Sequence, residues 1–125
     1  MKDRIRIASG QGFWGDLPSA PMDQATRGPV DYLVLDYLAE VTMSILRKQM
    51  RRDPLLGYAK DLVSLMRPLL PVMAERGLRV VTNGGGVNPR SCAKAIIEEA
   101  RRQGFTGVKI GIVTGDDILD NVDTL

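Results

Sequence analysis

The sequence predicts an α/β fold with a mostly parallel β-sheet and flanking helices. Short runs of apolar, often β-branched residues recur along the chain, and each is followed by a helical or turn segment. Nearly continuous apolarity is typical of parallel strands, which helices cover on both faces. Alternation of strands and helices also predicts right-handed crossover connections. At 125 residues the chain is expected to be at most one domain, residues 1–125.

The predicted strands are four apolar runs, at residues 5–8, 32–35, 78–81 and 108–113. An apolar stripe at helical spacing from Leu38 to Met50 follows the second run. A second helical segment, at about residues 60–76, contains two prolines. Because proline removes a helical hydrogen bond, we expect a kink there, or two short helices meeting near Arg67.

The last predicted helix covers residues 90–103. Asn88 is its expected N-cap and Pro89 occupies the first helical position, a combination that is typical of helix starts. Gly77 and Gly104 are the expected C-terminal caps of the second and last helices.

Composition and charge exclude several classes of protein. The apolar fraction of 44% and the charged fraction of 26% are ordinary for a soluble globular protein. With a net charge of +2 and 5% aromatic residues, neither nucleic acid nor a membrane is an expected partner. No signal peptide or bilayer-spanning run is visible, and a single cysteine excludes an internal disulfide, so we expect a cytoplasmic location.

The absence of histidine limits the chemistry that the chain can perform. It removes Ser-His-Asp and Cys-His machinery and histidine zinc sites, which leaves carboxylates, lysine, tyrosine and backbone donors. Cys92 lies near a helix N-terminus, where the dipole could lower its pKa, but it has no histidine to pair with. We therefore expect Cys92 to be a packing residue, and the methionines to fill the core.

A glycine-rich loop follows the third predicted strand and leads into the last helix. Its residues 82–89 include Gly84, Gly85, Gly86 and the N-cap Asn88. Exposed N–H groups and the positive end of the helix dipole favour an anion at such a place. A tight turn is the alternative explanation, but it accounts for one or two glycines more easily than for three.

Polar residues and glycines gather where each predicted strand ends, at the sheet edge where ligands bind in α/β proteins. Any one junction could be a helix cap or a turn, but four together favour a shared site. The residues are Gly12, Trp14 and Asp16 after the first run, Asp36 and Glu40 after the second, Asn83, Gly84, Gly85, Gly86 and Asn88 after the third, and Asp116 and Asp117 after the fourth.

The acidic members of this set, Asp16, Asp36, Glu40 and Asp116, are the candidate catalytic or metal-binding residues. Together with Asp117 they could hold a hard cation such as Mg²⁺, or one of them could act as a general base if burial raised its pKa. Helix capping and turn formation explain them about equally well.

The predicted helix that contains the apolar stripe from Leu38 to Met50 ends in a basic cluster. This cluster is expected to be a solvated face, and phosphate binding is its minority interpretation. Its members are Arg47, Lys48, Arg51 and Arg52.

Gly10, Gly12 and Gly15 match the dinucleotide fingerprint G-x-G-x-x-G, with Asp36 near the place of a ribose-binding acid. That fingerprint needs a helix to begin at the third glycine. Two prolines within residues 16–21 make such a helix unfavourable. An NAD(P)-dependent oxidoreductase of Rossmann type therefore stays an alternative and not the main interpretation.

Several segments of the chain resemble the acyclic terpene utilisation proteins of the AtuA type. The resemblance covers nearly the whole chain, and its second segment is long enough to be specific. Members of this family are considerably longer, so the resemblance implies that the chain is similar to their N-terminal part within a larger α/β domain. The segments are GFWGD at 12–16, DYLVLDYLAEVTMSIL at 31–46, GYA at 57–59, TNGGGVNP at 82–89 and VTGDD at 113–117.

This resemblance implies a role in bacterial catabolism of acyclic terpenes such as citronellol and geraniol, which proceeds through acyl-CoA intermediates. We expect a small anionic metabolite as the ligand, either an acyl-CoA or a carboxylate. The glycine loop and Asn88 would bind the anion, and Asn83 would orient a carbonyl. A non-catalytic binding or assembly fragment, forming a homo-oligomer or associating with a C-terminal region, is the second interpretation.

Overall fold

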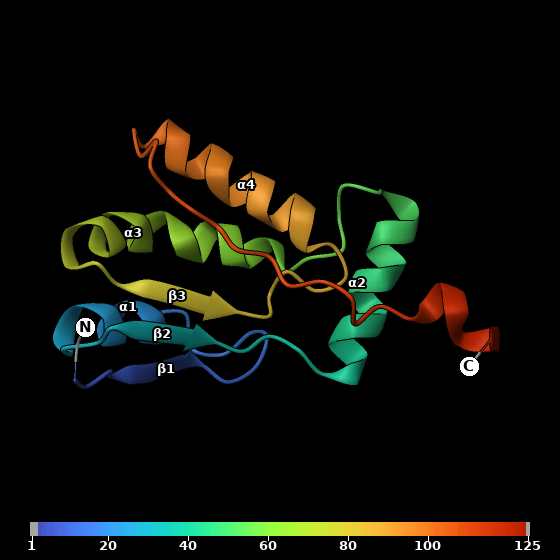
Figure 1. Cartoon of the computed structure of the whole chain (residues 1–125), viewed down its shortest axis with the longest axis horizontal. Coiled ribbons are helices and arrows are strands. Elements are labelled where there is room, and N and C mark those ends of the chain that lie inside the picture. The colour runs from blue at the N-terminus through green and yellow to red at the C-terminus, as the bar shows by residue number, and fades with distance from the viewer. Residues whose placement is uncertain (1–2, 125) are drawn as a thin grey trace.

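The computed structural model describes residues 3–124 and consists of a three-stranded, all-parallel sheet with helices (Figure 1). The predicted α/β class is therefore confirmed. The strands β1 (Ile7–Gln11), β2 (Tyr32–Leu35) and β3 (Arg79–Thr82) lie in the order β1-β2-β3. The described helices are α1 (Ala20–Arg27), α2 (Glu40–Arg52), α3 (Lys60–Arg76), α4 (Pro89–Arg102) and a 3₁₀ helix, η1 (Leu119–Thr124).

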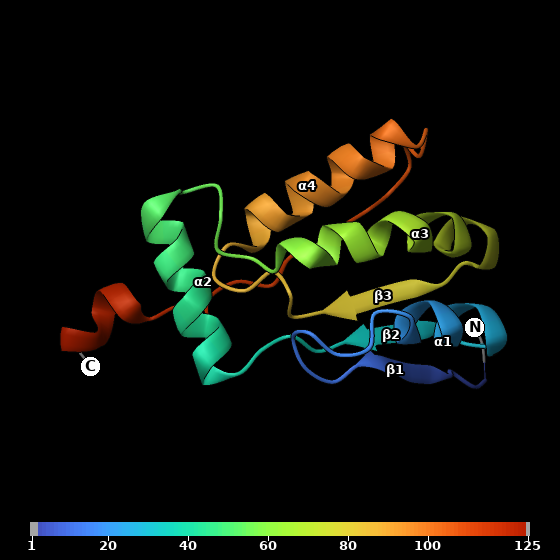
Figure 2. The ribbon, with the colours of Figure 1, turned by 180° about the vertical axis from the view of Figure 1, so that it is seen from behind.

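The helices form layers on one side of the sheet. Helix α3 lies between the sheet and α4 in both views (Figures 1 and 2). Helix α1 packs against β1, β2 and α3. Helix α2 lies beyond the carboxyl ends of the strands, where the arrowheads point (Figure 1). Within residues 3–124, no helix is both long and apolar enough to cross a bilayer.

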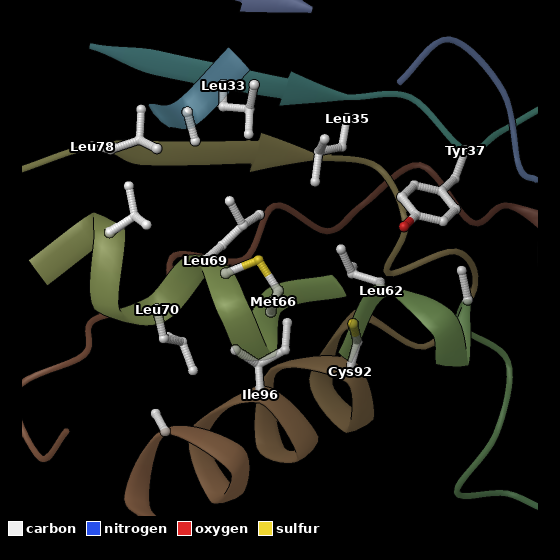
Figure 3. Close-up of a cluster of buried hydrophobic side chains, with 14 residues drawn as sticks. Leu33, Leu35, Tyr37, Leu62, Met66, Leu69, Leu70, Leu78, Cys92 and Ile96 are labelled. Carbon is white, nitrogen blue, oxygen red and sulfur yellow. The ribbon is translucent and has the colours of Figure 1, made fainter. Parts of the chain in front are cut away.

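The core is the contact between β2, α3 and α4 (Figure 3). Leu33 and Leu35 of β2 and Leu69 of α3 are fully buried. On the far side of α3, Cys92 and Ile96 of α4 complete the core. Burial raises the pKa of the Cys92 thiol to about 11, which confirms a packing role and not a reactive thiolate.

The opposite face of the sheet is open, so the expectation that helices cover both faces is wrong for residues 3–124. Ile7 of β1 is 69% exposed and Val81 of β3 is 53% exposed. The side chains of Arg79 and Tyr32 cover part of this face. The Arg79 guanidinium lies over the Tyr32 ring, 5.4 Å from its centre. The length of an apolar run therefore does not show whether helices cover one face of a strand or both faces.

The predicted fourth strand does not form. Residues 108–113 belong to no strand, and the chain from α4 runs back toward α2 without joining the sheet (Figure 1). The side chains of Val108 and Ile110 pack against the core, whereas Lys109 is exposed. The alternation of apolar residues therefore reflects burial of one side of an extended segment and not hydrogen bonding to a neighbouring strand. The last residue of this run, Val113, is 95% exposed.

The first junction also differs from the expectation. Strand β1 begins two residues later than predicted, so Gly10 and the buried Gln11 belong to the strand. A Cβ at Gly10 would lie 2.9 Å from the Leu33 side chain, which leaves room for glycine only. Helix α1 was not predicted, but Pro21 lies in its first turn, where no backbone N–H is needed.

Helix α3 is continuous across Pro68 and Pro71, so two short helices are not formed. Pro71 cannot donate to the carbonyl of Arg67, which is four residues earlier. The side chain of Gln103 replaces this donor, since its Nε2 lies 3.0 Å from the Arg67 oxygen. Packing against α4 therefore satisfies the backbone group that the proline leaves free.

The predicted caps Asn88 and Gly77 are confirmed, whereas the C-cap of α4 is Gln103 and the left-handed Gly104 follows it. Asn88 Oδ1 accepts from the Ser91 N–H at 3.3 Å, and Pro89 is the first residue of α4. Gly77 ends α3 with a left-handed φ of 68°, and its N–H donates to the Met73 carbonyl.

One buried carboxylate joins α3 and α4. Glu99 is 4% exposed and accepts from Arg67 Nε at 2.9 Å, from Arg102 at 2.7 Å and from Gln103 at 3.0 Å. These donors hold the pKa of Glu99 below its ordinary value, and the hydrogen bond from Arg67 has the largest effect.

We predict that Glu99→Gln lowers the free energy of unfolding at pH 7 and that this loss narrows in acid. A lowered folded-state pKa adds stability that is present above the ordinary glutamate pKa of 4.5 and is lost as pH falls through the lowered value. Urea unfolding of both proteins at pH 7 and near pH 3 measures the difference. An equal gap at both pH values would contradict the prediction.

Candidate functional site

The glycine loop is a structural joint at the carboxyl edge of the sheet. The Gly86 N–H donates to the Asn83 carbonyl at 3.0 Å, and the Gly84 N–H donates to Thr82 Oγ1 at 3.0 Å. The Val87 N–H donates to the Gly57 carbonyl at 2.9 Å. These N–H groups are already used within the chain, so an anion would have to compete with internal partners for them.

Each of the three glycines also has a packing reason. A Cβ at Gly84 would lie 2.9 Å from the Leu62 side chain, and one at Gly85 would lie 3.0 Å from Pro89. Gly86 has a φ of 54°, and a Cβ there would overlap the Leu46 side chain. Close packing therefore explains all three glycines, where a turn alone explains fewer.

Two of the predicted junctions meet directly. Asn83 Nδ2 donates to Asp36 Oδ1 at 2.7 Å, and Asn83 Oδ1 accepts from the Tyr37 N–H at 2.8 Å. The hydrogen bond from Asn83, followed by that from the Leu38 N–H, holds the pKa of Asp36 below its ordinary value. Asp36 is exposed, and as an ionised carboxylate it fastens the end of β2 to the end of β3.

At the first junction, Asp16 closes the loop that follows β1. Its carboxylate accepts from the Gly12 N–H at 2.9 Å and from the Leu17 N–H at 2.7 Å. These two hydrogen bonds, of which the one from Gly12 has the larger effect, lower the pKa of Asp16. Trp14, in the same loop, donates from Nε1 to Asp61 Oδ1 at 2.8 Å.

The remaining predicted acids stand apart. Glu40 begins α2 and is exposed, and Asp116 is exposed on the segment after α4. Its neighbour Asp117 forms an ion pair with Arg47 of α2. The Arg47 hydrogen bond lowers the pKa of Asp117. Within residues 3–124, no three acidic or cysteine side chains converge as a metal site would require.

Two hollows border Asp61, which accepts the hydrogen bond from Trp14. The first, which we call the basic hollow, has a volume of about 470 Å³, within the size range of small-molecule sites. It is lined by Trp14, Gln49, Arg52, Leu56, Tyr58, Lys60 and Asp61. Within residues 3–124, neither Arg52 nor Lys60 has an ion-pair partner.

The second hollow, which we call the proline-lined hollow, has a volume of about 420 Å³ and lies between the β1 loop, α1 and α3. Asp61 borders both hollows. The lining residues of the proline-lined hollow are Gln11, Gly15, Asp16, Pro18, Pro21, Met22, Asp61, Ser64, Leu65, Pro68 and Leu69.

A buried tyrosine lies at the same end of the sheet. Tyr37 is 1% exposed, and within the described chain its hydroxyl forms no hydrogen bond that meets normal geometry. Burial, and then the charge of Asp61, raise the pKa of Tyr37 far above its ordinary value. The hydroxyl is therefore neutral at all physiological pH values.

We predict that Tyr37→Phe raises the free energy of unfolding by about 1 kcal/mol, since a buried hydroxyl without a partner costs about 1 to 3 kcal/mol. Urea unfolding of the two proteins measures the change. A clear loss of stability would instead mean that the hydroxyl has a partner, such as the neighbouring Gln11 side chain or a buried water molecule.

The sequence interpretation found Trp14 but not the other residues of the basic hollow. The sequence pattern indicates Lys60 and Asp61 only as the beginning of a helix, and Arg52 as part of a solvated face. One signal was present, because Gly57-Tyr58-Ala59 is among the segments that carry the family resemblance. The Asn88 side chain docks this region, donating to the carbonyl of Leu56 at 2.8 Å.

Together, these observations define a parallel α/β protein with ligand-sized hollows at the carboxyl edge of its sheet. The helix after the first loop begins at Ala20 and not at Gly15, so this loop lacks the geometry of the dinucleotide fingerprint, as expected.

Residues 5–125 match the family model described as acyclic terpene utilisation family protein AtuA. The chain therefore belongs to this family, which confirms the resemblance. No curated protein and no solved structure matches it.

Proposed function

We propose that this protein acts in the catabolism of acyclic terpenes by binding an anionic metabolite, an acyl-CoA or a carboxylate, in the basic hollow. The observation that carries the proposal is the pairing of two cations with two aromatic rings in one hollow. Arg52 and Lys60 supply the charge, and Trp14 and Tyr58 supply flat apolar surface. An anion with an apolar or planar part matches both features.

The positions of the two cations support this proposal. Arg52 is the last residue of α2, and Lys60 is the first residue of α3. The N-terminus of the 17-residue helix α3 adds the positive end of its dipole beside Lys60. Family membership supports the pathway, since it connects the chain with acyclic terpene utilisation.

The predicted catalytic carboxylates, Asp16, Asp36, Glu40 and Asp116, are retained as part of this proposal. Asp36 is the first to test, because its contact with Asn83 joins two strand ends at the carboxyl edge. If Asp36→Ala and Asp116→Ala change neither ligand binding nor turnover, their catalytic assignment is wrong.

Titration of the single tryptophan tests the binding proposal, because Trp14 lines the basic hollow. The probes are geranyl-CoA, free CoA, geranate and NAD. We expect binding of a CoA probe or geranate to change the Trp14 emission and to raise the melting temperature by mass action. The affinity should also fall as the salt concentration rises, because the attraction is between charges.

Charge removal gives the matched comparison. Arg52→Ala and Lys60→Ala should each weaken binding by about fivefold, the effect of about 1 kcal/mol expected for a solvated charge contact. Arg51→Ala removes the neighbouring exposed charge of α2, which does not line the hollow, and should leave the affinity within about twofold. Equal losses in all three variants would contradict the site, and binding of NAD alone would favour the dinucleotide alternative.

A further inference from the structure

The proline-lined hollow differs in chemistry from the basic hollow beside it. Three prolines, Met22, Leu65 and Leu69 form most of its wall, from α1, α3 and the loop between β1 and α1. Proline rings are stiff and carry no N–H, and a half-buried methionine adapts its shape to an apolar guest. At its base, Gln11 is 5% exposed, and its Nε2 already donates to the Phe13 carbonyl at 3.0 Å.

Charge separates the two hollows. The basic hollow contains Arg52 and Lys60, whereas the proline-lined hollow contains Asp16 and Asp61 and no cation. Backbone hydrogen bonds hold the pKa of Asp16 low, so this carboxylate is charged at neutral pH. An anionic group is thus attracted to one hollow and repelled by the other, although both lie against Asp61.

The two hollows share one lining residue, Asp61. Trp14 Nε1 donates to Asp61 Oδ1 at 2.8 Å, and both residues are accessible from the basic hollow. Asp61 also borders the proline-lined hollow. Because the two hollows share Asp61, one extended molecule that passes this side chain reaches both.

We propose that the two hollows are subsites for one amphiphilic ligand, with its anionic head in the basic hollow and its apolar chain in the proline-lined hollow. This inference rests on the proposed function and extends it, because it assigns chain-length specificity to a second set of residues. The shared chemistry is an anion joined to a flexible apolar chain, whether a CoA thioester or a free carboxylate.

Chain-length dependence of binding tests the inference. Affinities of free CoA, acetyl-CoA, hexanoyl-CoA and decanoyl-CoA, and of acetate, hexanoate and decanoate, are measured by Trp14 emission with calorimetry as a second readout. We expect decanoyl-CoA to bind at least about tenfold more tightly than acetyl-CoA, since burial of two methylene groups suffices for that ratio. The carboxylate series shows whether the CoA part is needed.

A filling variant localises the chain. Ser64 is exposed and lines the proline-lined hollow, so Ser64→Phe should reduce the ratio of decanoyl-CoA to acetyl-CoA affinity to about one while leaving free CoA affinity unchanged. The matched control is Ser44→Phe, at an exposed serine of α2 that lines neither hollow, and it should keep the ratio. If Ser64→Phe does not fold, Pro18→Phe, at an exposed position of the same hollow, replaces it.

The results separate this inference from the proposed function. If free CoA, acetyl-CoA and decanoyl-CoA bind the wild type equally well, the chain subsite is overturned while the basic hollow stands. If Ser64→Phe weakens free CoA and decanoyl-CoA to the same extent, the chain does not lie in the proline-lined hollow. If neither series binds, the proposed function fails and this inference fails with it.

Discussion

Gly86→Ala is expected to lower the free energy of unfolding by about 3 kcal/mol. Gly86 has a φ of 54°, a left-handed conformation that costs a residue with a side chain about 1 to 2 kcal/mol. A Cβ at this position would also overlap the Leu46 side chain and lie 2.7 Å from the Gly57 carbonyl oxygen. Overpacking of this kind costs about 1 to 3 kcal/mol more.

Gly77→Ala is the matched control for this prediction. Gly77 has a similar φ of 68°, but nothing lies within 4 Å of the place where its Cβ would be. It should therefore show only the conformational cost, about 1 kcal/mol. Urea unfolding of the three proteins measures both changes, and equal losses for the two variants would mean that crowding at Gly86 has no energetic effect.

The parts of the fold that could be predicted from the sequence are those governed by local chemistry. Asn88, Pro89 and Gly77 act at helix ends through hydrogen bonds and backbone angles that neighbouring residues determine, and the structure confirms them. The continuity of α3 depends instead on Gln103, which is 36 residues away from the carbonyl that it satisfies. Sequence spacing around the prolines does not contain that information.

The predicted fourth strand failed for a related reason. Val108 and Ile110 are half-buried and Lys109 is exposed, so the alternation in the sequence reports a real pattern of burial. Pairing with a strand, however, depends on where the chain runs after α4. A period of two therefore predicts an extended segment with one buried face, and hydrogen bonding to a sheet is a separate property.

The sequence predicts the edge of the sheet where the basic hollow lies but, apart from Trp14, not the residues that line it. The carboxyl edge of the sheet follows from parallel topology, and Asp36 and Asn83 meet there as the strand ends predict. The glycine loop also docks residues 57–59, because the Val87 N–H donates to the Gly57 carbonyl and the Gly84 carbonyl accepts from the Ala59 N–H. The cations Arg52 and Lys60 line one hollow because the end of α2 lies near the start of α3.

The packing of α2 against the glycine loop depends mainly on one side chain, Leu46. Shortening this side chain is the second substitution for which we expect a large loss of stability. Leu46 is fully buried, and besides it α2 buries only Thr42 among its residues. We expect Leu46→Ala to lower the free energy of unfolding by about 3 kcal/mol, as the loss of a well-packed leucine does. Ile45→Ala, at a neighbour that is 43% exposed, should cost less than about 1 kcal/mol.

The same variant tests whether Leu46 and Gly86 act as one contact. Shortening Leu46 removes the atoms that a Cβ at Gly86 would overlap, although the Gly57 oxygen remains. Gly86→Ala should thus cost about 1 kcal/mol less in the Leu46→Ala background than in the wild type, a coupling that a double-mutant cycle in urea detects. Strict additivity would show that α2 and the glycine loop are stabilised independently.

Because α2 carries Arg52, Leu46→Ala should also weaken ligand binding in the basic hollow, whereas Ile45→Ala should not.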